Sequence, residues 1–149
     1  MQLMLGAGLR ASEVVALKRE NVEISERKGS LVIYSGKGNK TRQVPLNSKI
    51  RSLLLEYTKD STNEGTLFLG QRGGLKTPIS LNKILDFYAK KAGIRCHPHS
   101  LRHTFAYNYL KNNPSDIVGL AQILGHSNIN TTAIYTQNRL EDLQEKVEF

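Results

Sequence analysis

The stretch "HPHSLRHTFA" (residues 97–106) holds three of the four histidines of the chain and an arginine within seven residues. If a helix starts at Pro98, His99 and Arg102 share one helical face, and His103 lies four positions after His99. A forked guanidinium beside an imidazole is well suited to holding a phosphate. The stretch therefore predicts a helix that presents His99 and Arg102 to a phosphate, and the alternative is a polar face turned to water.

A metal site is the competing interpretation of the same helix, because His99 and His103 have a spacing that zinc sites use. A zinc site needs at least a third ligand, and the sequence contains no HExxH motif. Cys96 and His97 precede the helix and could reach the other two histidines only through a contrived bend. We therefore expect no metal and no other cofactor.

Helices dominate the predicted structure around this stretch. Residues 47–59 have apolar positions at i, i+3, i+4 and i+7, with Asn47 as the expected N-cap, and residues 80–93 repeat the pattern behind Ser80. The expected apolar stripes are Ile50, Leu53, Leu54 and Tyr57 in the first helix and Leu81, Ile84, Leu85 and Tyr88 in the second. Further helices are expected over residues 1–8, 11–21, 98–112, 115–124, 131–135 and 139–147.

One hairpin interrupts the helices. Residues 31–34 and 41–46 are rich in β-branched and apolar residues, and "GKGN" between them supplies turn residues. The stretch "NVEIS" (residues 21–25) predicts a further short strand. The predicted fold class is mainly α with a small antiparallel β-sheet (α+β), in a single domain, which suits a length of 149 residues.

Charge points to a polyanionic partner. The chain carries 21 Lys and Arg against 13 Asp and Glu, a net charge of +8. Residues 27–55 and 87–115 contain basic residues and no acidic ones. Two such blocks favour nucleic acid, although a basic surface can also serve solubility alone. No apolar run has the length of a membrane span, and the single cysteine fits a reducing, cytoplasmic setting.

Three further clusters contain candidate functional residues. Arg10 in "GLRASEV" enters a helix where an anion is favoured, although it could simply pair with Glu13. Lys37 stands at the hairpin tip, which lacks the P-loop pattern and could be an ordinary basic turn. In "LGHSNINTTAIYTQ", His126 follows a helix-ending glycine and Tyr135 comes nine residues later. Alternatively, Tyr135 is a core residue, or "NTTAIY" is the second helix of a loose helix-turn-helix.

Together, four segments resemble the tyrosine recombinase (phage integrase) family in order and spacing: "GAGLRASEVVAL", "GKGNKTRQVPL", "HPHSLRHTFA" and "LGHSNINTTAIYT". The resemblance covers nearly the whole chain. It implies a mostly α catalytic domain with a small sheet, and strand exchange between two DNA duplexes by a protein tetramer. The protein would be encoded by a bacterium or a phage.

The resemblance also implies roles for individual residues. Arg10 and Arg102 would clamp the phosphate, Lys37 would act from the hairpin tip, and Tyr135 would be the nucleophile. His99 and His126 would be the active-site imidazoles, and His103 would be structural. Lys40 and Arg42 are expected to contact DNA phosphates.

The implied reaction is phosphoryl transfer without a metal or ATP. The Tyr135 hydroxyl attacks the scissile phosphate and displaces the 5′-hydroxyl, which leaves a 3′-phosphotyrosyl bond that another strand's 5′-hydroxyl reseals. Two arginines compensate the charge that develops on the phosphate. Tyrosine has a pKa of about 10, so it needs a base; His99 is the candidate base and Lys37 the candidate acid.

Two alternatives differ from a recombinase. A helix-turn-helix module would bind DNA without cleaving it, and a type IB topoisomerase would share the chemistry without joining two duplexes. We expect residues 1–149 to be a catalytic-domain fragment, with the N-terminal DNA-binding domain and the first catalytic-domain helix absent. Residues 137–149 would form a tail helix that docks on a neighbouring subunit. The fragment itself is expected to be a monomer that forms tetramers only as part of the full protein on DNA.

Overall fold

Helices, a three-stranded sheet and a minimal two-stranded pair make up the computed structural model, which describes residues 1–34, 41–59, 65–70, 73–74 and 77–136. The fold class predicted from the sequence is confirmed. In these residues, no helix combines the length and the apolar character that crossing a bilayer requires. The hairpin tip with Lys37 and Lys40 and the tail predicted over residues 137–149 lie outside the described residues.

The sheet has three antiparallel strands in the order β1 (Val22–Ile24), β2 (Gly29–Tyr34) and β3 (Thr41–Pro45). Leu31 pairs with Val44, and both side chains are completely buried. Because the side chains of a strand alternate between faces, this register turns one face of the sheet toward the helices. The strands β4 (Leu69–Gly70) and β5 (Gly73–Gly74) form a separate minimal pair in a region expected to be loop.

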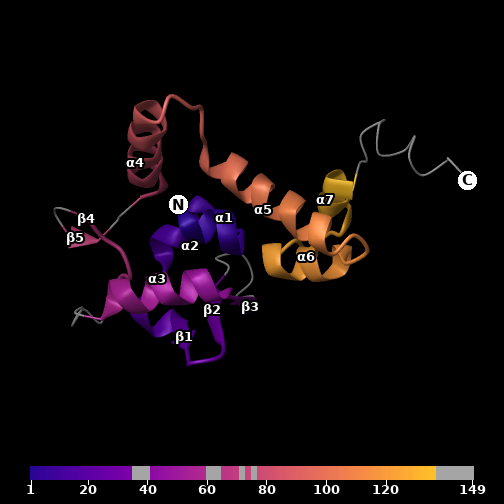
Figure 1. Ribbon diagram of the computed structural model, residues 1–149, viewed down its shortest axis with the longest axis horizontal. Coiled ribbons are helices and arrows are strands. Elements are labelled where there is room, and N and C mark those ends of the chain that lie inside the picture. Colours follow the sequence, from indigo (N-terminus) through magenta and orange to yellow (C-terminus); the bar gives the residue numbers. More distant parts are fainter. Residues whose placement is uncertain (35–40, 60–64, 71–72, 75–76, 137–149) are drawn as a thin grey trace, which may run out of the picture.

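The described residues form seven α-helices, which in Figure 1 lie above the sheet and extend away from it. They are α1 (Gln2–Ala7), α2 (Ala11–Ala16), α3 (Ser48–Thr58), α4 (Pro78–Lys91), α5 (Pro98–Asn112), α6 (Ile117–Leu124) and α7 (Asn130–Ala133). Short 3₁₀ turns follow α2 and α7, at Arg19–Asn21 (η1) and Ile134–Thr136 (η2). The α5 helix runs from the loop that follows α4 to the group formed by α6 and α7.

The apolar side chains form two core clusters. The larger cluster joins α1 and α2 to the sheet, α3 and the start of α4. The smaller one lies between α5 and α6 and consists of Ala106, Leu110, Leu120 and Leu124, with Tyr135 packed against it. The second cluster therefore fixes the segment that carries Tyr135 on the helices that carry Arg102 and His126.

Two glycines with a left-handed backbone end helices where the chain must turn. Gly8 (φ 66°) ends α1 and Gly125 (φ 67°) ends α6. A β-carbon on Gly8 would lie 2.5 Å from the ring of Phe105, so both the backbone angle and the space require glycine. These turns deliver Arg10 and His126, which follow closely in the chain, to the same side of α5.

The helix expected over residues 11–21 ends at Ala16, and Arg19–Asn21 form the separate turn η1. Two further details of the predicted helices are wrong. Thr77, not Ser80, caps α4, because its hydroxyl accepts the backbone N–H of Ser80. The apolar stripes are also narrower than predicted: Ile50 and Leu54 are buried in α3, and Leu81 and Leu85 in α4. The other four members of the predicted stripes are exposed, namely Leu53, Tyr57, Ile84 and Tyr88.

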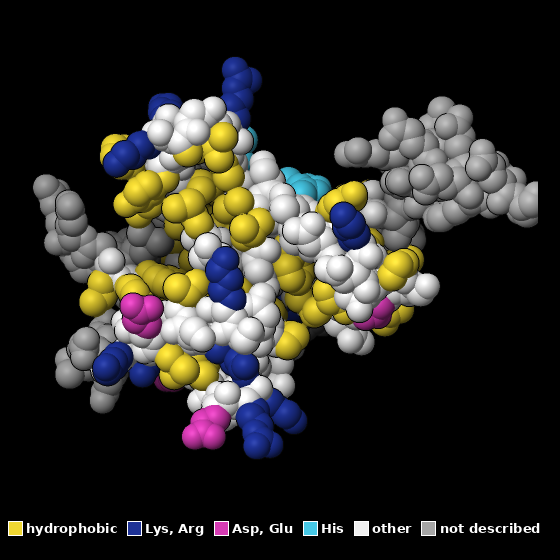
Figure 2. All heavy atoms as spheres, viewed as in Figure 1, with side chains coloured by type: hydrophobic (Ala, Val, Ile, Leu, Met, Phe, Trp, Pro, Cys, Tyr) yellow, Lys and Arg dark blue, Asp and Glu magenta, His cyan; other side chains and the backbone are white. Residues whose placement is uncertain are grey.

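The exposed members follow from how the two helices pack. Within the described residues, α4 packs mainly on α2 and α3 mainly on α1, so each helix buries only a strip one residue wide per turn. Figure 2 shows the result, with apolar side chains at the surface over α4 and around α3.

Candidate active site

Five of the six residues predicted to be catalytic line one open cavity of about 600 Å³. They are Arg10, His99, Arg102, His126 and Tyr135. Arg10 comes from the start of α2, two residues come from α5, and the last two come from the turn after α6 and from η2. Lys37 lies outside the described residues. Residues spread over most of the sequence thus share one cavity, and their catalytic roles remain predictions.

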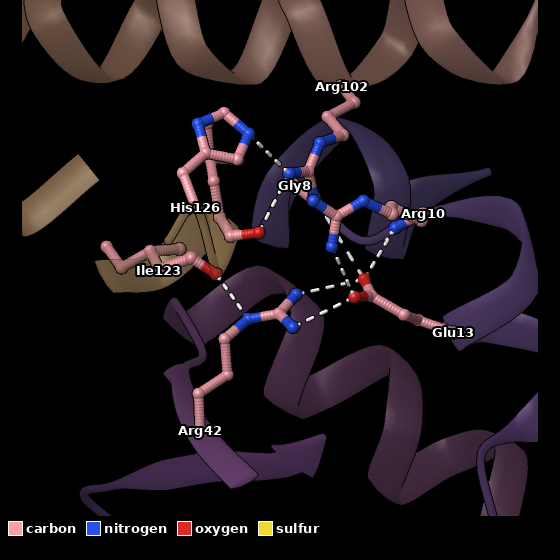
Figure 3. A network of polar contacts seen from close by, with 8 residues as sticks. Gly8, Arg10, Glu13, Arg42, Arg102, Ile123 and His126 are labelled. Atoms are coloured by element: carbon pink, nitrogen blue, oxygen red, sulfur yellow. Dashed lines mark hydrogen bonds and ion pairs between the residues drawn. The ribbon is translucent and has the colours of Figure 1, made fainter. Parts of the chain in front are cut away.

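The carboxylate of Glu13, which the sequence indicated only as a partner of Arg10, organises the arginines around this cavity (Figure 3). Glu13 accepts hydrogen bonds from the backbone N–H of Arg10 (2.8 Å) and from its Nη1 (3.0 Å). It also accepts two bonds from Arg42, at 2.8 and 2.9 Å. Burial raises the pKa of Glu13, but its hydrogen bonds with Arg42 and Arg10 and their charges outweigh burial and lower it. Glu13 is therefore an anion that holds the guanidinium groups in place.

Arg102 is buried at the back of the cavity, with 4% of its side chain exposed. Its Nη1 donates to the carbonyl of Gly8 (2.5 Å) and its Nη2 to the carbonyl of Leu124 (2.8 Å), which are residues at the ends of α1 and α6. Burial lowers its pKa to about 10, with the charge of Arg10 acting in the same direction and that of Glu13 opposing. Arg102 thus remains a cation at neutral pH.

His126 is held between Arg102 and Thr132. Its Nε2 lies 3.1 Å from Arg102 Nη2, and its Nδ1 lies 2.9 Å from Thr132 Oγ1. A guanidinium nitrogen only donates, so Nε2 accepts, and the neutral ring carries its proton on Nδ1. Burial and the charges of Arg102, Arg10 and Arg42 lower the pKa of His126 to about 4. The imidazole is therefore neutral at pH 7 in this arrangement.

Tyr135 is half-buried beside the ring of His103. The ring of His103 lies 5.1 Å from that of Tyr135 and 4.1 Å from that of His99, centroid to centroid. Burial raises the pKa of Tyr135, and the charges of Arg102 and Arg10 oppose this effect without cancelling it. A Tyr135 nucleophile would need a base, and His103 is the imidazole in ring contact with it.

Three residues acquire a place at the site that sequence reasoning did not give them. Glu13 and Thr132 were not predicted to act there, and His103 was expected to be merely structural although it lines the cavity. Arg42 was predicted to contact DNA, but 13% of its side chain is exposed and its NH groups bond to Glu13 and to the carbonyl of Ile123. Arg42 is thus mostly buried and bonded to residues of α2 and α6.

The hydroxyl of Thr132 can be tested separately from the catalytic groups. The Thr132 side chain is completely buried, so Thr132→Val would leave the Nδ1 proton of His126 without an acceptor. We expect a loss of about 1–3 kcal/mol in the free energy of unfolding. Thr132→Ser keeps the hydroxyl and should lose less, as urea denaturation of both variants would show. If Val and Ser behave alike, the hydrogen bond contributes nothing measurable.

The low pKa of His126 predicts how stability depends on pH. Between about pH 6.5 and 4 the unfolded chain binds a proton at His126 that the folded chain does not. Stability should therefore be complete above pH 6.5 and decrease as the pH falls through this range. The pKa of His103 is also lowered, mainly by burial, so His103 contributes to the same decrease in stability. Urea titrations from pH 7.5 to 4.5 should show the decrease, and His126→Gln should flatten it; stability that is constant over the range would contradict the assignment.

The fold and the cavity define a class of protein: a helical domain that surrounds a tyrosine with arginines and imidazoles suited to a phosphate. The comparisons with known proteins agree with this class. The sequence profile of the phage integrase family matches residues 1–141. The chain belongs to this family, which comprises tyrosine recombinases.

Individual relatives are similar over nearly the whole chain. Tyrosine recombinase XerC of Bradyrhizobium diazoefficiens is 37% identical over 142 residues, which are 91% of this chain and 44% of that protein. The crystal structure of XerA recombinase matches 97% of this chain and 54% of its own, with 31% identity and a TM-score of 0.80. The structure of XerH recombinase, in a pre-cleavage complex with its difH substrate, matches 99% of this chain and 44% of its own, with 29% identity and a TM-score of 0.78. The chain spans about half the length of these relatives.

Neither rival interpretation of the histidine and tyrosine segments gains support from the structure. Among the described residues, no group of three or more potential ligands is arranged to hold a metal ion. The α7 helix, expected as a recognition helix in the DNA-binding alternative, has four residues, its Thr132 is buried, and Tyr135 lines the cavity. The segment is thus built to place side chains inside the site and not in a DNA groove.

Proposed function

We propose that this chain is the catalytic domain of a recombinase that cleaves and rejoins double-stranded DNA through a 3′-phosphotyrosyl intermediate. The observation that carries the proposal is that Tyr135 lines the same cavity as Arg10, Arg102 and His126. A module that only binds DNA has no use for a half-buried phenol beside two guanidinium groups. Membership of the tyrosine recombinase family and the basic blocks of the sequence support the same proposal.

The arginines receive the scissile phosphate. Arg10, at 43% side-chain exposure, reaches the cavity from its rim, and Arg102 reaches it from behind. Both are held by protein contacts before the substrate binds, so their charges need little reorganisation in the transition state. Each such donor is typically worth about 3–4 kcal/mol of transition-state stabilisation.

His126 becomes a donor when the phosphate enters. The same arginine charges that lower its pKa are partly neutralised by the phosphate anion, so the pKa of His126 rises on binding. A protonated imidazole can donate from Nε2 to a non-bridging oxygen while Nδ1 keeps its bond to Thr132. The hydroxyl of Thr132 accepts this bond in both protonation states of the ring.

Proton transfer completes the reaction. The Tyr135 hydroxyl loses its proton to an imidazole, attacks phosphorus and forms the phosphotyrosyl ester while the P–O5′ bond breaks. His99 is the proposed base, and the ring of His103 contacts the rings of both His99 and Tyr135. Lys37 is the proposed acid that protonates the leaving 5′-oxygen. Rejoining runs through the same steps in reverse.

The proposed partners are double-stranded DNA and, for the full-length protein, three further copies of the same protein. Residues 137–149 would dock on a neighbouring subunit within such a tetramer, as the family resemblance implies. The isolated chain would be a monomer that grips DNA through Lys40 and other basic residues. Binding through phosphates depends steeply on salt, so the experiments below are best carried out at low ionic strength.

A single experiment tests the proposal. The chain is incubated with a duplex that is nicked next to the cleavage position, so that the short cleaved strand diffuses away and the adduct accumulates. We expect a protein–DNA complex that survives denaturant, forms in the presence of a chelator and needs no ATP. Binding of the duplex without any covalent complex, over several substrate sequences, would reduce the function to DNA binding.

A further inference from the structure

Arg42 connects three segments that are distant in the sequence. It lies on β3, opposite Ile33 of β2, and its side chain leaves the sheet toward α2 and α6. Its Nε donates to the carbonyl of Ile123 at 2.7 Å, and its Nη1 and Nη2 form a two-pronged contact with Glu13. All three guanidinium nitrogens therefore have acceptors within the protein, and Arg42, unlike Arg102, does not line the cavity.

At one end, Arg42 controls the carboxylate that positions the phosphate-binding arginines. Glu13 is 8% exposed and bonds to Arg10, and one of its oxygens lies 4.0 Å from Arg102 Nη1. Without Arg42 this buried carboxylate would lose its two shortest side-chain hydrogen bonds. It would then attract Arg10 and Arg102 more strongly and compete with the phosphate for both guanidinium groups.

At the other end, Arg42 holds the turn that carries His126. Carbonyl groups at the end of a helix lack partners within the helix. At the end of α6, Arg42 donates a hydrogen bond to the carbonyl of Ile123, and Arg102 donates one to the carbonyl of Leu124. A β-carbon on Gly125 would lie 2.8 Å from Nη1 of Arg42. The guanidinium thus lies directly against the residue that precedes His126.

We infer that Arg42 is a positioning residue that holds Arg10, Arg102 and His126 in their phosphate-binding arrangement without touching the phosphate itself. The inference rests on the proposed function for what the arrangement does. The inference also gives the hairpin a second role. Strand β3 follows the segment that contains Lys37, and the side chain of Arg42 connects β3 to the residues behind the cavity. A positioning role differs from a DNA contact in its effect on rate, affinity and salt dependence.

Arg42→Lys is the decisive variant, because lysine keeps the charge but cannot form the two-pronged contact and bond to Ile123 at once. At saturating nicked duplex we expect adduct formation to slow by roughly 100-fold, the scale of a small misplacement of catalytic groups. The Kd for DNA and its salt dependence should match the wild type. Arg19→Met, which removes an exposed charge on η1 outside both basic blocks, is the control and should leave the adduct rate unchanged.

A second readout is independent of activity. The pKa of His126, followed by NMR without DNA, should rise toward 6.5 in Arg42→Lys if its contact with Arg102 is loosened. Glu13→Gln removes the same contact from the other side, so its rate loss should not add to that of Arg42→Lys in the double variant. This cycle also serves as the test if Arg42→Lys alone proves too unstable to assay.

Contrary outcomes are distinct. A wild-type rate in Arg42→Lys overturns the inference, and so does a salt dependence lower by about one unit in Arg42→Met, which would mark a direct phosphate contact. Additive losses for Glu13→Gln and Arg42→Lys would also overturn it. If the wild-type chain forms no adduct at all, the proposed function fails; an unchanged His126 pKa in Arg42→Lys would then separately refute the positioning role.

Discussion

Tyr135→Phe is expected to abolish the covalent adduct with nicked DNA completely, while binding of the same duplex stays within about twofold of the wild type. The substitution removes only the hydroxyl. The ring that packs against the α5–α6 cluster and contacts His103 is retained, so the fold and the cavity should persist. Denaturing gels measure the adduct, and fluorescence anisotropy measures binding at low salt.

Tyr107→Phe is the matched control, because Tyr107 is an exposed tyrosine on α5 that does not line the cavity. It should form adduct at the wild-type rate. An adduct that persists in Tyr135→Phe would show that another residue is the nucleophile. Loss of DNA binding in the same variant would show instead that the phenol serves recognition and not attack.

Local signals explain why so much of the fold is readable from the sequence. Asn47 was expected to cap α3, and its side chain accepts the backbone N–H of Ile50. Glycine residues mark the ends of α1 and α6, and the two strands around "GKGN" pair as predicted. Each signal depends on a few adjacent residues, so no knowledge of the tertiary structure is needed to interpret it.

The supporting residues of the site could not be found in this way. Glu13 looks like a partner of Arg10 in the sequence, which it is, but its stronger partner Arg42 is 29 positions away. Thr132 is one of two adjacent threonines, and only the fold decides which of them faces His126. The motif spacing marks groups suited to a phosphate, whereas the groups that hold them are defined by long-range packing.

The sequence also failed to predict which residues of each helix are exposed, again because long-range packing decides this. A 3.6-residue period predicts which residues share a helical face, but not how much of that face a neighbour covers. Tyr88 on α4 fits the apolar stripe and is 51% exposed, whereas Arg102 on α5 is polar and 4% exposed. Arg102 can be buried because the carbonyl groups at two helix ends and His126 accept three of its five N–H groups.

This burial makes Arg102→Lys the second variant with a large expected effect. An arginine that stabilises a phosphoryl-transfer transition state contributes about 10³–10⁵ in rate, and we expect a loss of at least 10³ in adduct formation. A lysine ammonium is a single point of charge. It cannot bond to Gly8, Leu124 and His126 and also present a forked donor to the phosphate. Single-turnover kinetics at saturating nicked duplex measure the loss.

Stability must be separated from chemistry in this variant, because a carbonyl left unpaired costs about 1–3 kcal/mol when buried. Urea denaturation should show a loss of that order, with enough folded protein left to assay. Arg51→Lys changes a half-buried arginine on α3, remote from the cavity, and should affect neither rate nor DNA binding. If folded Arg102→Lys forms adduct within tenfold of the wild-type rate, Arg102 does not contact the reacting phosphate. Its role would then be confined to joining the ends of α1 and α6, and Arg10 alone would have to compensate the charge of the transition state.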